Sequence, residues 1–144
     1  MLKPKPILLI EDNEDDELLC LRALKKVNLK NDVVVARDGA AALDLIFDAA
    51  TKMPEGEVPF ALILLDLGLP KIGGMEVLAR LHEDAVLRRI PVVIMTTSSL
   101  DEDKIKSYDL GANSFVRKPV AFSDFSETVA HLGLYWLLIN ELPS

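Results

Sequence analysis

The chain has 144 residues, half of them hydrophobic, and a formal net charge of −7. This length suits one domain with a single core, and the acidic balance excludes a basic surface for binding nucleic acid. The single cysteine, Cys20, excludes an internal disulfide bond and fits a reducing compartment, so we expect a cytoplasmic protein.

The first predicted strand, Ile7 to Ile10, is apolar throughout and leads directly into Glu11 and Asp12. A continuous apolar run of this kind is typical of a strand buried on both faces in a parallel sheet. The acidic residues at 14–16 suit the start of a helix, because the N–H groups exposed there carry partial positive charge. The helix itself is predicted from apolar residues at helical spacing, which are Leu19, Ala23, Leu24 and Val27.

The next segment repeats the strand-then-helix order. A short strand rich in valine is predicted over residues 32–36, and Asp38-Gly39 is interpreted as a turn. Apolar residues over 42–46 indicate a second helix, and the polar stretch from Thr51 to Pro59 indicates a loop.

The third predicted strand ends in a charged residue. Four apolar residues, 62–65, lead into Asp66, and Gly68 and Pro70 follow. An ionised carboxylate at the end of a buried strand is unfavourable unless a charged group meets it. Asp66 therefore requires a charged partner from elsewhere in the chain.

The rest of the chain contains three more predicted helices and two more strands. After Gly73-Gly74 a third helix is expected, and the apolar strand 91–96 ends in Thr96. Ser99 with Glu102 has the spacing of a capping box and predicts a fourth helix. A short strand over 114–117 precedes Lys118, and an extended C-terminal helix and tail occupy about 123–144. The apolar run within that tail is too short to cross a membrane.

These elements predict an α/β fold, with five strand–helix units in one domain over residues 1–144. Parallel crossovers are right-handed, so helices should cover both faces of a doubly wound, five-stranded parallel sheet. The carboxyl ends of such strands meet along one edge, where ligands bind. The residues that follow or end the strands there are Glu11, Asp12, Asp66, Thr96 and Lys118.

Three carboxylates at one edge repel one another, and a hard divalent cation relieves that repulsion. Mg²⁺ prefers oxygen ligands and is typically held by one or two carboxylates together with phosphate oxygens. The pattern therefore predicts a magnesium site beside Asp66, which would act as a nucleophile and form an aspartyl phosphate. Thr96 would donate its hydroxyl to a phosphoryl oxygen, and Lys118 would neutralise another oxygen.

This constellation resembles the receiver domain of bacterial two-component response regulators. The resemblance covers residues 7–130 and rests on the acidic pair at 11–12, the stretch 65–70 with Gly74 after it, the strand 91–96, Gly111-Ala112 and the segment 115–119. It implies a flavodoxin-like strand order of 2-1-3-4-5 and a histidine kinase as the phosphoryl donor to Asp66.

The resemblance also implies a role for individual residues. Asp12, Asp66 and the backbone carbonyl of Gly68 would bind Mg²⁺ directly, and Glu11 would act through water. Thr96 and Phe115 match the pair that moves when the family switches, although Phe115 is equally interpretable as a core aromatic residue. Gly68 and Ser98 replace side chains that influence loss of the phosphate, so the sequence does not predict the phosphate lifetime.

A narrower resemblance is to stand-alone regulators paired with bacterial phytochrome kinases. The C-terminal helix carries more apolar residues than one face needs, which predicts a homodimer. The alternative is that this surface docks the kinase or an output protein. The predicted interface, here called the C-terminal apolar patch, consists of Leu134, Tyr135, Leu138 and Leu142.

Three other functions were weighed. A phosphotransfer shuttle without its own output is the nearest alternative. A flavodoxin-like electron carrier would need a Gly-rich, hydroxyl-rich phosphate loop where residues 11–16 are mostly acidic. An aspartate-nucleophile phosphatase would carry a second Asp at the position of Gly68. We therefore expect a signalling protein that catalyses only its own phosphorylation and dephosphorylation.

Overall fold

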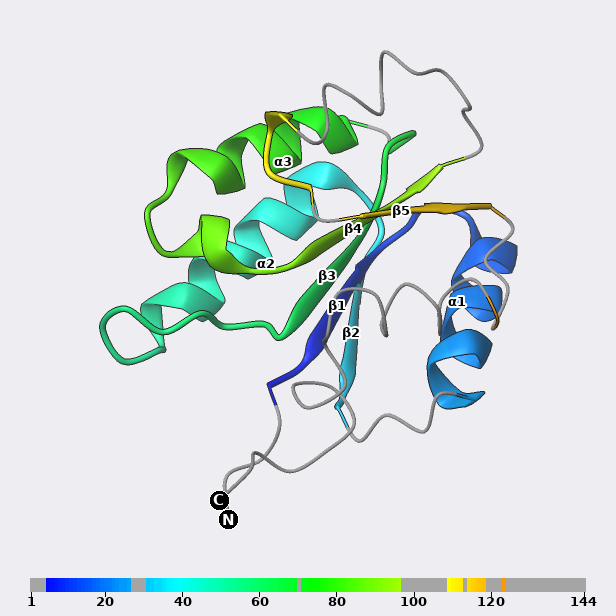
Figure 1. Cartoon of the computed structure of the whole chain (residues 1–144), viewed down its shortest axis with the longest axis horizontal. Helices are drawn as coiled ribbons and strands as arrows, with labels where there is room; N and C mark the ends of the chain where they lie inside the picture. Colours follow the sequence, from blue (N-terminus) through cyan, green and yellow to red (C-terminus); the bar gives the residue numbers. More distant parts are fainter. Residues whose placement is uncertain are drawn as a thin grey trace.

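The structure is a computed structural model that describes residues 5–26, 31–69, 71–96, 109–112, 114–118 and 123. Five parallel strands form one sheet in the order β2-β1-β3-β4-β5, as predicted. Three helices and a short 3-10 helix are described with them (Figure 1). The elements are β1 (Ile7–Ile10), α1 (Glu14–Lys26), β2 (Val33–Ala36), α2 (Gly39–Thr51), β3 (Leu62–Asp66), α3 (Gly74–Glu83), η1 (Leu87–Arg89), β4 (Val92–Thr96) and β5 (Ser114–Arg117).

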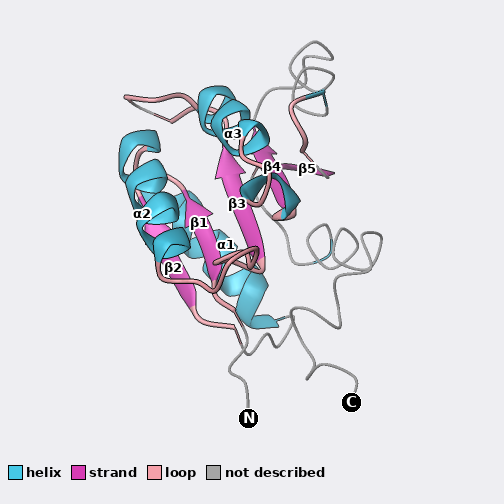
Figure 2. Cartoon of the chain, turned by 90° about the vertical axis from the view of Figure 1, so that its left-hand side faces the viewer, coloured by secondary structure: helices cyan, strands magenta, loops and turns pink. Residues whose placement is uncertain are grey.

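The helices cover both faces of the sheet. Figure 2 shows α2 and α3 on one face, and α1 lies on the other. Alternate residues of β1 point to opposite faces, so Leu8 and Ile10 pack with α2 and α3, whereas Ile7 and Leu9 pack with α1. Because both faces are covered, β1, β3 and β4 are buried along their whole length.

The remaining predicted helices fall largely outside the described residues. Of the fourth helix and its end only 109–112 are described, and of the C-terminal helix only residue 123. The C-terminal apolar patch also lies outside the described part of the chain. Within the described residues, no helix combines the length and apolar composition that a membrane span requires.

The predicted turn at Asp38-Gly39 is wrong. Asp38 is the N-cap of α2, and its side chain accepts a hydrogen bond from the N–H of Ala41 at 2.7 Å. Asp side chains favour both turns and helix caps, so the residue type does not separate the two. The helix continues to Thr51, the residue at which the loop was predicted to begin.

The connection from β3 to α3 packs closely against the start of α2. A Cβ atom on Gly39 would lie 1.9 Å from the carbonyl oxygen of Ile72, and one on Gly74 would lie 2.4 Å from the carbonyl oxygen of Asp66. Lys71 adopts a left-handed backbone conformation with φ of 65° and forms an ion pair with Asp38 at 3.5 Å. Gly39 thus allows the segment after Asp66 to rest on α2, and Gly74 allows the start of α3 to approach the end of β3.

Candidate functional site

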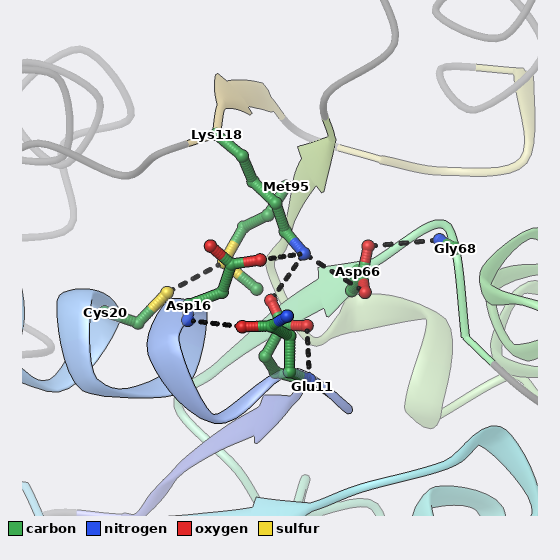
Figure 3. A network of polar contacts seen from close by, with 8 residues as sticks. Glu11, Asp16, Cys20, Asp66, Gly68, Met95 and Lys118 are labelled. Carbon is green, nitrogen blue, oxygen red and sulfur yellow. Dashed lines mark hydrogen bonds and ion pairs between the residues drawn. The ribbon is translucent and has the colours of Figure 1, made fainter.

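Asp66 is the last residue of β3, and its side chain lies at the carboxyl edge of the sheet (Figure 3). The two carboxylate oxygens have different partners. Oδ1 accepts a hydrogen bond from the N–H of Gly68 at 3.0 Å, and Oδ2 lies 3.2 Å from Nζ of Lys118. The buried carboxylate therefore has the charged partner that the sequence required.

Lys118 follows β5 and extends its ammonium group over the sheet edge, where it meets three carboxylates. Nζ lies 2.6 Å from Oε1 of Glu11, 3.2 Å from Oδ2 of Asp16 and 3.2 Å from Oδ2 of Asp66 (Figure 3). Burial alone would lower the pKa of Lys118. The close contact with Glu11 and the charge of Asp66 outweigh burial, so the pKa of Lys118 is raised and the ammonium stays charged.

Glu11 follows β1 and is completely buried. Its Oε2 accepts a hydrogen bond from the N–H of Asn13 at 3.2 Å, and its Oε1 is the oxygen paired with Lys118. Burial raises the pKa of Glu11 to about 7, because the ionised form loses its hydration, and the contact with Lys118 opposes part of that increase. This carboxyl group is therefore poised between its two protonation states near neutral pH.

The described residues contain one group of carboxylates arranged to hold a metal ion. Glu11, Asp12 and Asp66 each offer an oxygen, and these oxygens lie within 4.8 Å of one another. Glu11 and Asp66 are buried, whereas Asp12 is exposed and leaves the group open to solvent. Hard oxygen donors with one open side fit Mg²⁺ or Mn²⁺, because such ions keep several water ligands.

The neighbouring strand ends complete the edge. Thr96 is the last residue of β4 and is buried, and its carbonyl oxygen accepts a hydrogen bond from the N–H of Lys118 at 3.0 Å. Gly68 is exposed beside Asp66. The backbone of Phe115 belongs to β5, but its side chain lies outside what the structure describes, so its predicted role in switching stays a prediction.

The structure adds one acidic residue to the site that the sequence explains simply as part of a helix N-terminus. Asp16, in the first turn of α1, contacts Lys118. A sequence signal was present, because position 16 lies one helical turn before Cys20, on the stripe that Ala23 continues toward the sheet. Cys20 itself is buried, with its Sγ 3.3 Å from Sδ of Met95, and burial raises its pKa to about 12. Cys20 is therefore a core residue.

A family model described as the response regulator receiver domain matches residues 7–130 of the chain. The probable methanogenesis regulatory protein FilR2 of Methanothrix harundinacea is 39% identical over 143 residues, which covers 97% of this chain and 88% of FilR2. Response regulator Rcp1 of Synechocystis sp. is 37% identical over 145 residues, which covers 98% of this chain and 95% of Rcp1.

Solved structures agree with these sequence matches. The structure of the bacteriophytochrome response regulator AtBRR is similar with a TM-score of 0.80 at 46% identity, covering 97% of this chain and 100% of AtBRR. The crystal structure of the Mn²⁺-bound form of Rcp1 is similar with a TM-score of 0.75 at 38% identity, covering 98% of this chain and 100% of Rcp1.

Proposed function

Because the chain belongs to the response regulator receiver domain family, and so is a phosphorelay signalling protein, we propose that Asp66 is the residue that accepts the phosphoryl group. The observation that carries this proposal is the position of Asp66 and the residues around it. It is a buried carboxylate at a strand end, held by Lys118 at 3.2 Å and grouped with Glu11 and Asp12. The matches do not favour an electron carrier or a phosphatase.

The proposed reaction is a phosphoryl transfer from a histidine of the kinase. A carboxylate oxygen of Asp66 attacks phosphorus, and a P–O bond forms as the P–N bond breaks. The electron pair of the broken bond stays on the imidazole nitrogen of the kinase. Lys118 neutralises a phosphoryl oxygen, and the hydroxyl of Thr96 donates a hydrogen bond to another.

The group formed by Glu11, Asp12 and Asp66 is proposed to hold Mg²⁺, with the carbonyl of Gly68 as a further ligand. Support comes from the oxygen-only donor set and its open side, and from the Mn²⁺-bound form of the relative Rcp1. When bound, the ion would offset the negative charge of the incoming phosphoryl group. Glu11 is already paired with Lys118, which suits the predicted contact through water.

The proposed partners follow from the family and the relatives. Membership of the receiver family implies a histidine kinase, and the name of AtBRR supports a kinase of the phytochrome class. We favour signalling through protein contacts, with a homodimer formed through the C-terminal apolar patch. The single cysteine supports a cytoplasmic location.

Intact-protein mass spectrometry after incubation with acetyl phosphate or a cognate kinase tests the proposal. The wild-type chain should gain one phosphoryl group in the presence of Mg²⁺ and none when a chelator is added. Asp66→Asn should gain none, whereas the control Asp44→Asn, an exposed residue of α2, should react like wild type. A phosphorylated Asp66→Asn protein would disprove the assignment.

A further inference from the structure

Asp16 contacts the lysine of the site without belonging to the group of carboxylates that can hold a metal. It lies in the first turn of α1, and its N–H donates a hydrogen bond to Oδ1 of Asn13 at 3.0 Å. Asn13 in turn donates its N–H to Glu11. The position of Asp16 is therefore fixed relative to the end of β1, and its side chain points at the ammonium group of Lys118 (Figure 3).

The hydrogen-bonding capacity of Lys118 sets up a competition. An ammonium group has three N–H donors and no acceptor. In the structure its nitrogen faces three carboxylates, those of Glu11, Asp16 and Asp66, at 2.6, 3.2 and 3.2 Å. The contact with Asp16 is a hydrogen bond, whereas those with Glu11 and Asp66 are ion pairs. A phosphoryl oxygen that arrives at Asp66 therefore competes with Asp16 for a donor of Lys118.

The three contacts differ in how easily they are given up. The side chain of Glu11 is 0% exposed, so water cannot replace Lys118 as its partner. Asp66 carries the phosphoryl group itself. The side chain of Asp16 is 26% exposed, so water can take over the hydrogen bond that Lys118 withdraws.

We propose that Asp16 is a positioning residue that holds Lys118 in the unphosphorylated protein and releases it to the phosphoryl group. The inference rests on the proposed function of Asp66 and adds a determinant of how favourable the phosphorylated state is. Asp16 opposes the phosphorylated state in two ways. Its contact with Lys118 competes with the phosphoryl oxygens for the same ammonium group, and its negative charge offsets part of the positive charge that Lys118 offers them.

The test is titration with beryllofluoride, a mimic of the phosphoryl group, at saturating Mg²⁺ with NMR detection. Asp16→Asn should lower the half-saturating concentration about two- to fivefold, the range for loss of a partly exposed opposing charge. Asp16→Glu keeps the carboxylate and should stay near wild type. The control Asp15→Asn removes the same charge from the adjacent, exposed position and should also stay near wild type.

A second measurement separates positioning from a general effect on the site. The affinity for Mg²⁺ alone should be the same in Asp16→Asn and wild type, within about twofold, because the proposed ligands are unchanged. Unchanged or weaker binding of beryllofluoride by Asp16→Asn, or an equal gain in Asp15→Asn or in Mg²⁺ affinity, would overturn the inference. If wild type itself binds no beryllofluoride, the proposed function fails as well.

Discussion

At the scale of single residues, Lys118 is the cation that the described part of the chain places among four acidic side chains at the sheet edge. It joins the end of β1, the start of α1 and the end of β3, through Glu11, Asp16 and Asp66. Its backbone N–H adds a link to the end of β4 at Thr96. Lys118 therefore links four elements of the fold, three through its side chain and one through its backbone.

Lys118→Ala and Thr96→Ala should keep the fold but weaken the coupling between phosphorylation and output. Each removes a polar contact to the phosphoryl group, worth about 1.5–3 kcal/mol in the phosphorylated state. Glu11 can take up a proton when Lys118 is absent, because its pKa is already about 7. The measurement is partner or dimer affinity with and without beryllofluoride.

The matched control for these variants is Lys52→Ala. Lys52 also pairs with an acidic residue, Asp48 at 3.1 Å, but its side chain is 74% exposed on α2, far along the helix from the site. The control should respond to beryllofluoride like wild type. A full response in both Lys118→Ala and Thr96→Ala would contradict the roles assigned to them.

Glu11 should make the stability of the metal-free protein depend on pH. Its pKa is raised from 4.5 to about 7, so the folded protein binds a proton more readily than the unfolded chain. Its contribution to stability is fully present below the unfolded pKa and is lost as the pH rises through about 7. The free energy of unfolding, measured in urea between pH 5 and 8, should therefore fall with pH.

Glu11→Gln removes the titrating group and should flatten that decline, whereas the control Glu14→Gln, at an exposed position of α1, should keep it. Adding Mg²⁺ to wild type should also reduce the decline, because a bound cation favours the ionised carboxylate. An equal decline in wild type and Glu11→Gln would show that another group is responsible.

Asp66 and Thr96 were predictable because each stands at the end of an apolar run, and Lys118 because it follows the last predicted strand of the sheet. Parallel pairing then aligns the ends of these strands along one edge. Asp16 was missed because an acidic residue in a first helical turn already has a sufficient local explanation. Its contact with Lys118 spans 102 positions of sequence, which no local pattern encodes.

At the scale of elements, the connection between β3 and α3, which follows Asp66, is positioned by its packing against α2. Gly39 permits this approach, since an added Cβ atom would overlap the carbonyl of Ile72. Gly74 permits a separate approach, that of the start of α3 to the backbone of Asp66. The sequence indicated glycines and a helix start there. It did not indicate the contact, because Gly39 and Ile72 lie on different strand–helix units.

Gly39→Ala should lower the free energy of unfolding by about 1–3 kcal/mol, since its Cβ would overlap the carbonyl of Ile72. Alanine is otherwise the better helix former, so helix propensity alone predicts a higher free energy of unfolding for the variant. In Gly73→Ala the added Cβ would have no heavy atom within 4 Å, and the change should be below about 1 kcal/mol. Urea unfolding of both variants decides, and a stabilised Gly39→Ala protein would contradict the close packing.

At the scale of the whole molecule, the C-terminal apolar patch remains a prediction, because it lies outside the described residues. Light scattering should find a dimer for the full chain at tens of micromolar, and a monomer for a chain ending at Gly133. Leu138→Glu should also give a monomer, because it places a charge in the patch. Asn140→Glu, which adds the same charge at a polar position, should stay dimeric. A full chain that is monomeric with and without phosphorylation would rule out the homodimer, and the patch would then be assigned to docking of a kinase or output protein.

The order of the strands in space has a consequence for how the protein is made. The sheet edge is assembled from residues 11 to 118, and β5, which brings Lys118, is the last strand of the sheet to leave the ribosome. Domains are synthesised from the amino end, and contacts between distant segments form late. A nascent chain can thus contain Asp66 before Lys118, its charged partner, has been synthesised. The charged partner of Asp66 is therefore added only with β5, after the other four strands of the sheet have been made.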